Sequence, residues 1–176
     1  PSIASPSIAD VYERGISTAS VSKAFSLAGL RLGWIAGPRE VAEAVMVHRD
    51  YNTISVGMLD DHFATMALEN SGRILARSRA LVRENLGVLE AWVEAEPLIH
   101  WVKPEAGTTA LLRYDLDMSS REFCVALLRE TGVMFTPGSA LDMEGYARIG
   151  YAQAPEVLAA GLERVSAFLS NQSASG

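Results

Sequence analysis

The sequence predicts an α/β protein built from three consecutive parts. Residues 1–72 alternate short apolar segments with helical ones, and residues 73–95 carry the apolar stripe of one long amphipathic helix. Strands and helices then mix over residues 96–176, which predicts a small α+β domain at the C-terminal end. The 176 residues, of which 49% are hydrophobic, are enough for one core and part of a second.

The first part is expected to hold two strands and two helices. Residues 14–20 and 30–36 have extended patterns, and Gly37-Pro38 ends the second strand. Between them lies a crossing of small residues that holds Lys23. We expect a loop over residues 1–13 and helices over residues 38–50 and 58–70.

The third part has the stronger turn and cap signals. Ser119 and Glu122 form a capping box for a helix that ends at Gly132, and Pro155 opens a last helix through about residue 169. The polar tail from residue 170 is expected to fray. Strands are predicted over residues 98–102, 109–114, 133–136 and 147–151.

Composition excludes several classes of function. A net charge of −6 disfavours nucleic acid or anionic membrane as the main partner, and no apolar run is long enough to span a bilayer. The single Cys124 allows no internal disulfide, fits a cytoplasmic location, and is expected to be a small core residue. The three histidines are not spaced as a metal site. The chain opens at Pro1 without an initiator Met, so we expect a piece of a longer polypeptide.

Residues 20–34 carry the clearest chemical signal. Lys23 offers an amine to an electrophile, and small residues around it would let a flat cofactor approach the backbone. Ser20 and Ser22 offer hydroxyls to a phosphate, and Arg31 can reach the same anion with its planar guanidinium. This set is what a phosphorylated aldehyde cofactor requires. An isolated Ser-x-Ser-Lys would more often be a surface turn, but the Gly-x-Arg-x-Gly that follows favours the cofactor interpretation.

The segment from Ser20 to Trp34 resembles, without a gap, the lysine signature of class I/II aminotransferases, which are fold-type I enzymes dependent on pyridoxal 5'-phosphate (PLP). The resemblance implies that residues 1–72 are the last part of a large PLP-binding domain with a mixed, mostly parallel sheet. It also implies that Lys23 forms the Schiff base with PLP, and that Ser20, Ser22 and Arg31 bind the phosphate.

Three later segments are similar to landmarks of the same family. Arg148-Ile149-Gly150-Tyr151 resembles its Arg-[Ile/Leu]-x-[Phe/Tyr] strand, which implies that Arg148 grips the substrate α-carboxylate. Residues 132–138 resemble the Gly-Val-x-x-x-Pro-Gly turn. Residues 104–112 resemble its Pro-x-Gly-Gly-x-Phe strand entry, but Thr108 and Thr109 depart from it and would alter the substrate pocket.

The resemblance implies amino transfer between an α-amino acid and a 2-oxo acid in a homodimer, in which Asn52, Thr53 and Ser55 would reach the neighbour's cofactor or form a solvated connector. The family's ring-binding aspartate, asparagine and tyrosine lie upstream of these motifs, and Asp10 and Tyr12 are not assigned to those roles. We therefore expect the chain alone to be inactive and to need its N-terminal half or a second piece.

Two alternatives remain open. A lyase, decarboxylase or amino-acid cyclase, such as a capreomycidine synthase or a C–S lyase, shares the lysine segment, and the fate of the substrate after Cα deprotonation depends on groups that these residues barely define. A non-catalytic, aminotransferase-like sensor domain is the weaker alternative, because nothing in the sequence resembles a DNA-binding module.

Overall fold

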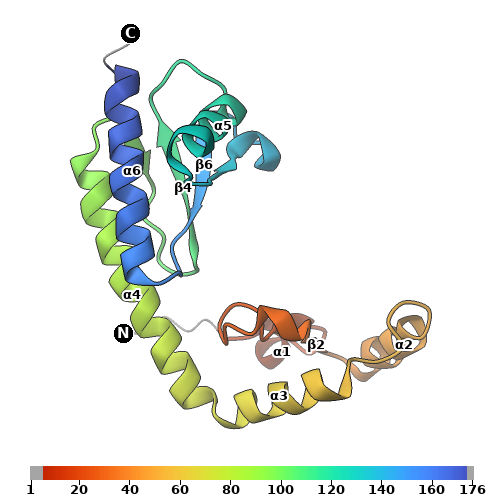
Figure 1. Cartoon of the computed structure of the whole chain (residues 1–176). Helices are drawn as coiled ribbons and strands as arrows, with labels where there is room; N and C mark the ends of the chain where they lie inside the picture. The colour runs from red at the N-terminus through yellow and green to blue at the C-terminus, as the bar shows by residue number, and fades with distance from the viewer. Residues whose placement is uncertain (1–5, 174–176) are drawn as a thin grey trace. The chain divides into compact units, whose positions relative to one another are not determined.

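The computed structural model describes residues 6–173, and the chain divides into two compact units, Pro1–Ser78 and Arg79–Gly176. The boundary falls inside one long helix, α4 (Ser71–Ala95), which Figure 1 shows as a continuous coil. The proposed division into 1–72, 73–95 and 96–176 stays a prediction.

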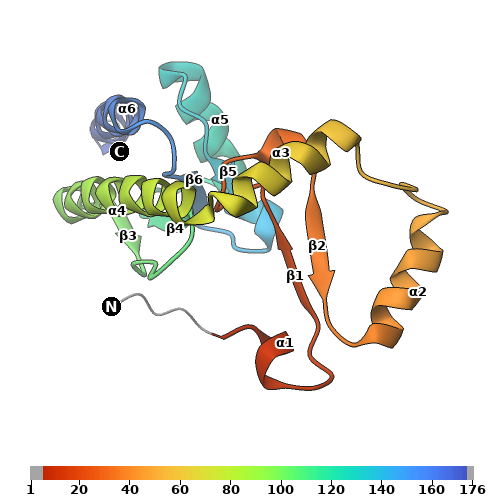
Figure 2. The same cartoon turned by 90° about the horizontal axis from the view of Figure 1, so that it is seen from below.

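The first unit contains a two-stranded hairpin. β1 (Ser17–Ser20) pairs antiparallel with β2 (Gly33–Ala36), and Figure 2 shows the two strands side by side. In this register Ser20 lies opposite Gly33. The expected mixed, mostly parallel sheet is not seen in the described residues of this unit, whose two strands are antiparallel. The physical reason is the connection: residues 21–32 form a compact loop, whereas a parallel pair needs a crossover, usually a helix.

Besides the start of α4, the described part of the first unit contains four helical segments: α1 (Ile8–Val11), η1 (Ala28–Leu30), α2 (Arg39–Arg49) and α3 (Met58–Glu69). The single turn α1 lies within residues expected to be a loop, because the Ser7 hydroxyl caps it by accepting a hydrogen bond from Ala9 N at 3.3 Å. The part of that expected loop before residue 6 lies outside the described residues.

Few apolar side chains are buried in the first unit. Among its described residues the buried hydrophobic side chains are Val21, Ala64 and Ala67. Both large side chains of β2 are exposed, Trp34 to 39% and Ile35 to 46%. The described part of this unit therefore has little core of its own.

The second unit is a four-stranded antiparallel sheet covered by helices. The strands are β3 (Ile99–Trp101), β4 (Thr109–Tyr114), β5 (Thr136–Pro137) and β6 (Tyr146–Gly150), in the order β3-β4-β6-β5. Burial alternates along β4 and β6, so one face of the sheet enters the core and the other carries Leu111, Arg113 and Arg148.

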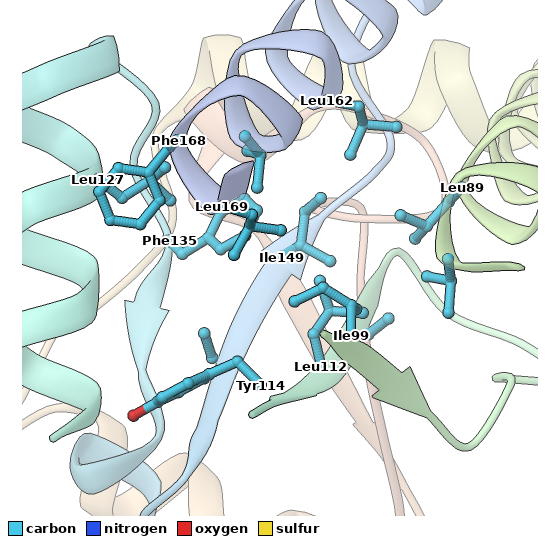
Figure 3. Packing of buried hydrophobic residues seen from close by; sticks show 14 of the residues in the cluster. Leu89, Ile99, Leu112, Tyr114, Leu127, Phe135, Ile149, Leu162, Phe168 and Leu169 are labelled. Carbon is cyan, nitrogen blue, oxygen red and sulfur yellow. The ribbon is translucent and has the colours of Figure 1, made fainter. Parts of the chain in front are cut away.

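The core of the second unit joins that buried sheet face to three helices: α4, α5 (Ser120–Thr131) and α6 (Pro155–Ser173). Figure 3 shows Leu89 of α4, Ile149 of β6 and Leu162 of α6 converging on one region. Tyr114 stacks on Phe123 with ring centroids 4.4 Å apart. The predicted capping box of α5 is present, and Gly132 ends the helix in the left-handed conformation.

Two predictions for this unit were wrong. Residues 133–135 are not a strand, and β5 instead includes Thr136 and Pro137 and leads into η2 (Gly138–Leu141). The helix does not end at residue 169: α6 continues to Ser173, and Ser170 Oγ donates to Ser166 O at 3.0 Å, whereas residues 174–176 of the expected tail lie outside the described residues. Buried Phe168 and Leu169 hold this last part of the helix on the core.

No helix in residues 6–173 is long and apolar enough to cross a membrane.

Candidate active site

Lys23 lies in the loop of the β1–β2 hairpin, and the loop backbone is firmly tied. Val21 N donates to Leu32 O at 3.2 Å, Leu27 N donates to Val21 O at 3.1 Å, and Ser26 N donates to Lys23 O at 3.0 Å. Val21 is fully buried, whereas Lys23 is exposed. The hairpin thus fixes the lysine backbone and leaves its amine available, with no hydrogen bond or ion pair to any described residue.

The predicted phosphate ligands belong to the same loop. The hydroxyl of Ser20 accepts from Ser22 N at 3.3 Å, so its own hydrogen is still free to be donated. One Arg31 nitrogen, Nη1, donates to Ala28 O at 2.7 Å, and the other guanidinium donors remain available. Arg31 has a φ of 50°, in the left-handed region, directly after η1. The structure therefore gathers Ser20, Ser22, Lys23 and Arg31 on one hairpin.

The two glycines of this segment differ in what they permit. A Cβ on Gly33 would lie 2.7 Å from Ala19 O, so this glycine allows β1 and β2 to pair. A Cβ on Gly29 would meet no atom within 4 Å, and no positive φ requires glycine there. The open space beside Gly29, the hydroxyls of exposed Ser20 and half-buried Ser22, and an unpaired amine together fit a flat, phosphorylated aldehyde.

A hollow of about 660 Å³ in the first unit lies to one side of this loop. Arg31, Trp34, Arg49 and Ser55 contribute to its wall, and the remaining lining is mostly apolar. Lys23, Ser20 and Ser22 do not line it. We therefore do not equate this hollow with the lysine site, since a cofactor must contact the lysine.

Arg148 belongs to the second unit, at the middle of β6. It lies opposite Leu111 of β4 and Thr136 of β5, on the sheet face away from the core. Its Nη2 donates to Thr136 Oγ1 at 3.2 Å, and the side chain is half-buried. A planar guanidinium held on a sheet face in this way has free donors for a carboxylate.

The sequence alone did not reveal a hydrogen-bond network that holds the segment directly after the Arg148 strand. Tyr151, which is fully buried, donates its N–H to Thr108 O at 2.9 Å and its hydroxyl to Gly107 O at 3.0 Å. Burial also raises the pKa of the Tyr151 phenol. Fully buried Asn85 donates Nδ2 to Tyr151 O at 2.7 Å and to Gln153 O at 2.8 Å. The available signal was a lone polar residue one turn before Leu89, on the apolar stripe of α4.

The remaining candidates have structural environments. Cys124 is buried in α5, and burial raises the pKa of its thiol to about 11, as expected of a core cysteine. The backbone N–H groups of Asn52, Thr53 and Ile54 all donate to Arg49 O, which forms a tight turn after α2. In residues 6–173, no three His, Cys, Asp or Glu side chains are grouped so as to hold a metal ion.

The fold and the site together define a class of protein. A hairpin presents a lysine beside two serine hydroxyls and a guanidinium, and an antiparallel sheet with helices on one face presents an arginine on the other. A family model described as "Aminotransferase class I and II" matches residues 4–165. The chain belongs to the class I and II aminotransferase family.

Individual relatives include more than one kind of enzyme. The chain is 30% identical to capreomycidine synthase from Streptomyces vinaceus, over 94% of this chain and 42% of that protein. It is 31% identical to aromatic-amino-acid aminotransferase 2 from Thermococcus litoralis, over 93% of this chain and 43% of that protein. The chain therefore spans about two fifths of the length of the curated relatives that it matches.

The solved structures that resemble this chain likewise include both an aminotransferase and a cyclase. A PLP-dependent aminotransferase from Streptococcus suis superposes with a TM-score of 0.93 at 40% identity, over 95% of this chain and 45% of that one. A PLP-dependent cyclase, OrfR, superposes with a TM-score of 0.83 at 32% identity, over 89% of this chain and 43% of that one. Both likenesses extend through the two units described above.

Proposed function

We propose that this chain is the C-terminal half of a PLP-dependent aminotransferase that moves an amino group between an α-amino acid and a 2-oxo acid. The observation that carries the proposal is the hairpin loop of residues 20–34, which fixes the backbone at Lys23 and leaves its amine without a described partner. The family model and the PLP-dependent structural neighbours support pyridoxal phosphate as the cofactor.

Each residue of the site has a role in this proposal. Lys23 Nζ would hold the aldehyde carbon of the cofactor and, once released, would carry a proton to or from the substrate Cα. Ser20, Ser22 and Arg31 would bind the phosphate, because hydroxyl and guanidinium donors suit a phosphate dianion. Arg148 would orient the substrate by pairing with its α-carboxylate. Bound PLP would supply the electron sink for the charge left at Cα.

We further propose that this half needs additional protein to be active. The described part of the first unit buries little apolar surface and exposes large side chains along β2, α2 and α3. Exposed apolar surface on this scale is typical of a face that another protein segment covers. The covering segment would be the N-terminal half or a second piece. The complete enzyme would be a cytoplasmic homodimer that acts on amino-acid and oxo-acid substrates and not on nucleic acid or membrane.

The lysine content of the chain makes a sharp test possible. Only Lys23 and Lys103 are present, and Lys103 Nζ donates to Glu90 Oε1. In the complete enzyme, borohydride reduction followed by peptide mass spectrometry should find the cofactor on Lys23. Lys23→Ala should abolish both the attached cofactor and turnover, whereas the control Lys103→Arg should retain both. Full activity of Lys23→Ala would refute the proposal.

A cyclase or lyase is the second candidate, favoured by the likeness to capreomycidine synthase and to the cyclase OrfR. Thr108 follows the Gly107 turn at the entry to β4, where the family's usual residues are replaced. The two functions differ in their products. Conversion of PLP to pyridoxamine phosphate by an amino donor supports transfer. Release of ammonia or a cyclised product without a second oxo acid supports the alternative.

A further inference from the structure

A buried asparagine ties α4 to the strand that carries Arg148. Asn85 is fully buried in the middle of α4, where Leu89 and Val93 continue the same face into the core. Asparagine is a poor helix former, and burying its amide costs free energy unless the amide is hydrogen-bonded. A residue with these two disadvantages indicates a specific requirement at this position.

The hydrogen bonds of Asn85 define that requirement. Its Nδ2 donates both hydrogens, to Tyr151 O at 2.7 Å and to Gln153 O at 2.8 Å. Two carbonyl acceptors on one side fix the orientation of the amide, because an amide oxygen could not face them. The other atom, Oδ1, is buried and accepts no hydrogen bond from the described residues. The position thus uses the donors of asparagine and leaves its acceptor unpaired.

Those two carbonyls follow directly after β6. Tyr151 comes three residues after Arg148, and the N–H of Tyr151 extends the sheet by donating to Thr108 O. The Tyr151 hydroxyl donates to Gly107 O, so this residue is held at its amide, its carbonyl and its side chain. Through its hydrogen bond to Tyr151, Asn85 therefore holds in place both the end of β6 and the turn at Gly107 and Thr108.

We propose that Asn85 is a positioning residue for the substrate carboxylate. It holds the C-terminal end of β6, and with it Arg148, at a fixed position relative to the Gly107–Thr108 turn. This inference rests on the proposed function of Arg148. The Thr136 hydroxyl accepts a hydrogen bond from the Arg148 guanidinium at 3.2 Å. Loss of Asn85 frees the strand end while leaving the Arg148 side chain chemically intact.

The test compares Asn85→Ala with Leu89→Ala in the complete, PLP-loaded enzyme. Leu89 is equally buried, one turn further along α4, and has no hydrogen bond to β6 from its side chain. Two ligands are compared. The first is the standard L-amino acid that serves as the best amino donor, and the second is the primary amine that differs from it only in lacking the carboxylate. Their affinities come from titration of the cofactor absorbance, and hydrogen exchange is followed on residues 146–153.

We expect Asn85→Ala to raise KM for the amino acid by about 10-fold or more, with a smaller change in kcat, because a small displacement of a binding group weakens substrate orientation. The affinity for the amine should be unchanged, and exchange at Tyr151 N–H should accelerate. In an Arg148→Ala background, Asn85→Ala should add no further loss of carboxylate affinity. If Asn85→Ala does not fold, Asn85→Ser, which keeps one donor, makes the same comparison.

Two results separate the inference from the function on which it rests. If Arg148→Ala weakens amino-acid binding but Asn85→Ala behaves like Leu89→Ala towards both ligands, Asn85 is merely structural and the inference is wrong. If Arg148→Ala leaves the preference for the carboxylate unchanged, the proposed role of Arg148 fails, and the inference fails with it.

Discussion

Gly138 begins the turn after β5, and we expect its replacement by alanine to destabilise the second unit severely. A Cβ at this position would lie 1.9 Å from Met143 O and 2.5 Å from Tyr146 O. Both obstacles are backbone atoms, so no side-chain rotation relieves the contact. The conformation itself is not the difficulty, since Gly138 is not among the glycines with positive φ.

The expected loss of stability can be worked out from the segment that must move to make room for the methyl group. Displacing the 143–146 segment breaks the hydrogen bond from Met143 N to Gly138 O, 2.9 Å long, and such a bond contributes about 1 kcal/mol. Forcing a methyl group into closely packed surroundings costs about 1–3 kcal/mol more. We therefore expect Gly138→Ala to lower the free energy of unfolding by roughly 2–4 kcal/mol.

Urea unfolding followed by tryptophan fluorescence measures this change in the second unit. The chain has three tryptophans, and Trp34→Phe leaves Trp92 and Trp101, both in that unit, as reporters. Gly87→Ala is the matched control, because Gly87 lies on the exposed side of α4 and a Cβ there meets nothing within 4 Å. That control should gain about 1 kcal/mol from helix propensity. An unfolding midpoint for Gly138→Ala equal to that of the parent would refute the steric argument.

Two further predictions concern the start of α5. Ser119→Ala removes the hydroxyl that accepts from Glu122 N, and it should lower the free energy of unfolding in the same urea assay by about 1 kcal/mol; an unchanged value would show that the capping box contributes nothing. The hydrogen bond from Ser120 N is the main reason that the pKa of Glu144 is lowered. Its stabilising contribution is therefore present above the unfolded pKa, about 4.3, and is lost as pH falls through the lower folded pKa. Glu144→Gln should flatten the loss of stability below that pH, and an acid limb identical to that of the parent would contradict this account.

Local signals explain which parts of the fold could be predicted. The alternating apolar pattern of residues 109–114 matches the observed bounds of β4, and the capping box at Ser119 marks the true start of α5. Residues 133–136 have a similar apolar composition, but only Thr136 joins the sheet. Its pairing depends on β6, which follows later in the chain, and composition does not encode that contact.

The candidate site shows the same division between local and distant information. The spacing from Ser20 to Trp34 was enough to place Lys23 and its neighbours on one loop, because the whole set is contiguous. Asn85 and Tyr151 are separated by 66 positions, so their hydrogen bond has no local pattern. A polar residue within an apolar helical stripe was the one sign available, and it indicates a partner without identifying it.

The exposed apolar residues of the first unit link the sequence pattern to the proposed function. Trp34-Ile35-Ala36 is an uninterrupted apolar run, which is typical of a strand buried on both faces. All four residues of β2 are nevertheless exposed in the described structure. The pattern therefore predicts cover that the described residues do not supply, and β2 lies directly after the lysine loop. Exposed β2 therefore agrees with the proposal that this half needs additional protein to be active, and Gly33 belongs both to this strand and to the lysine signature.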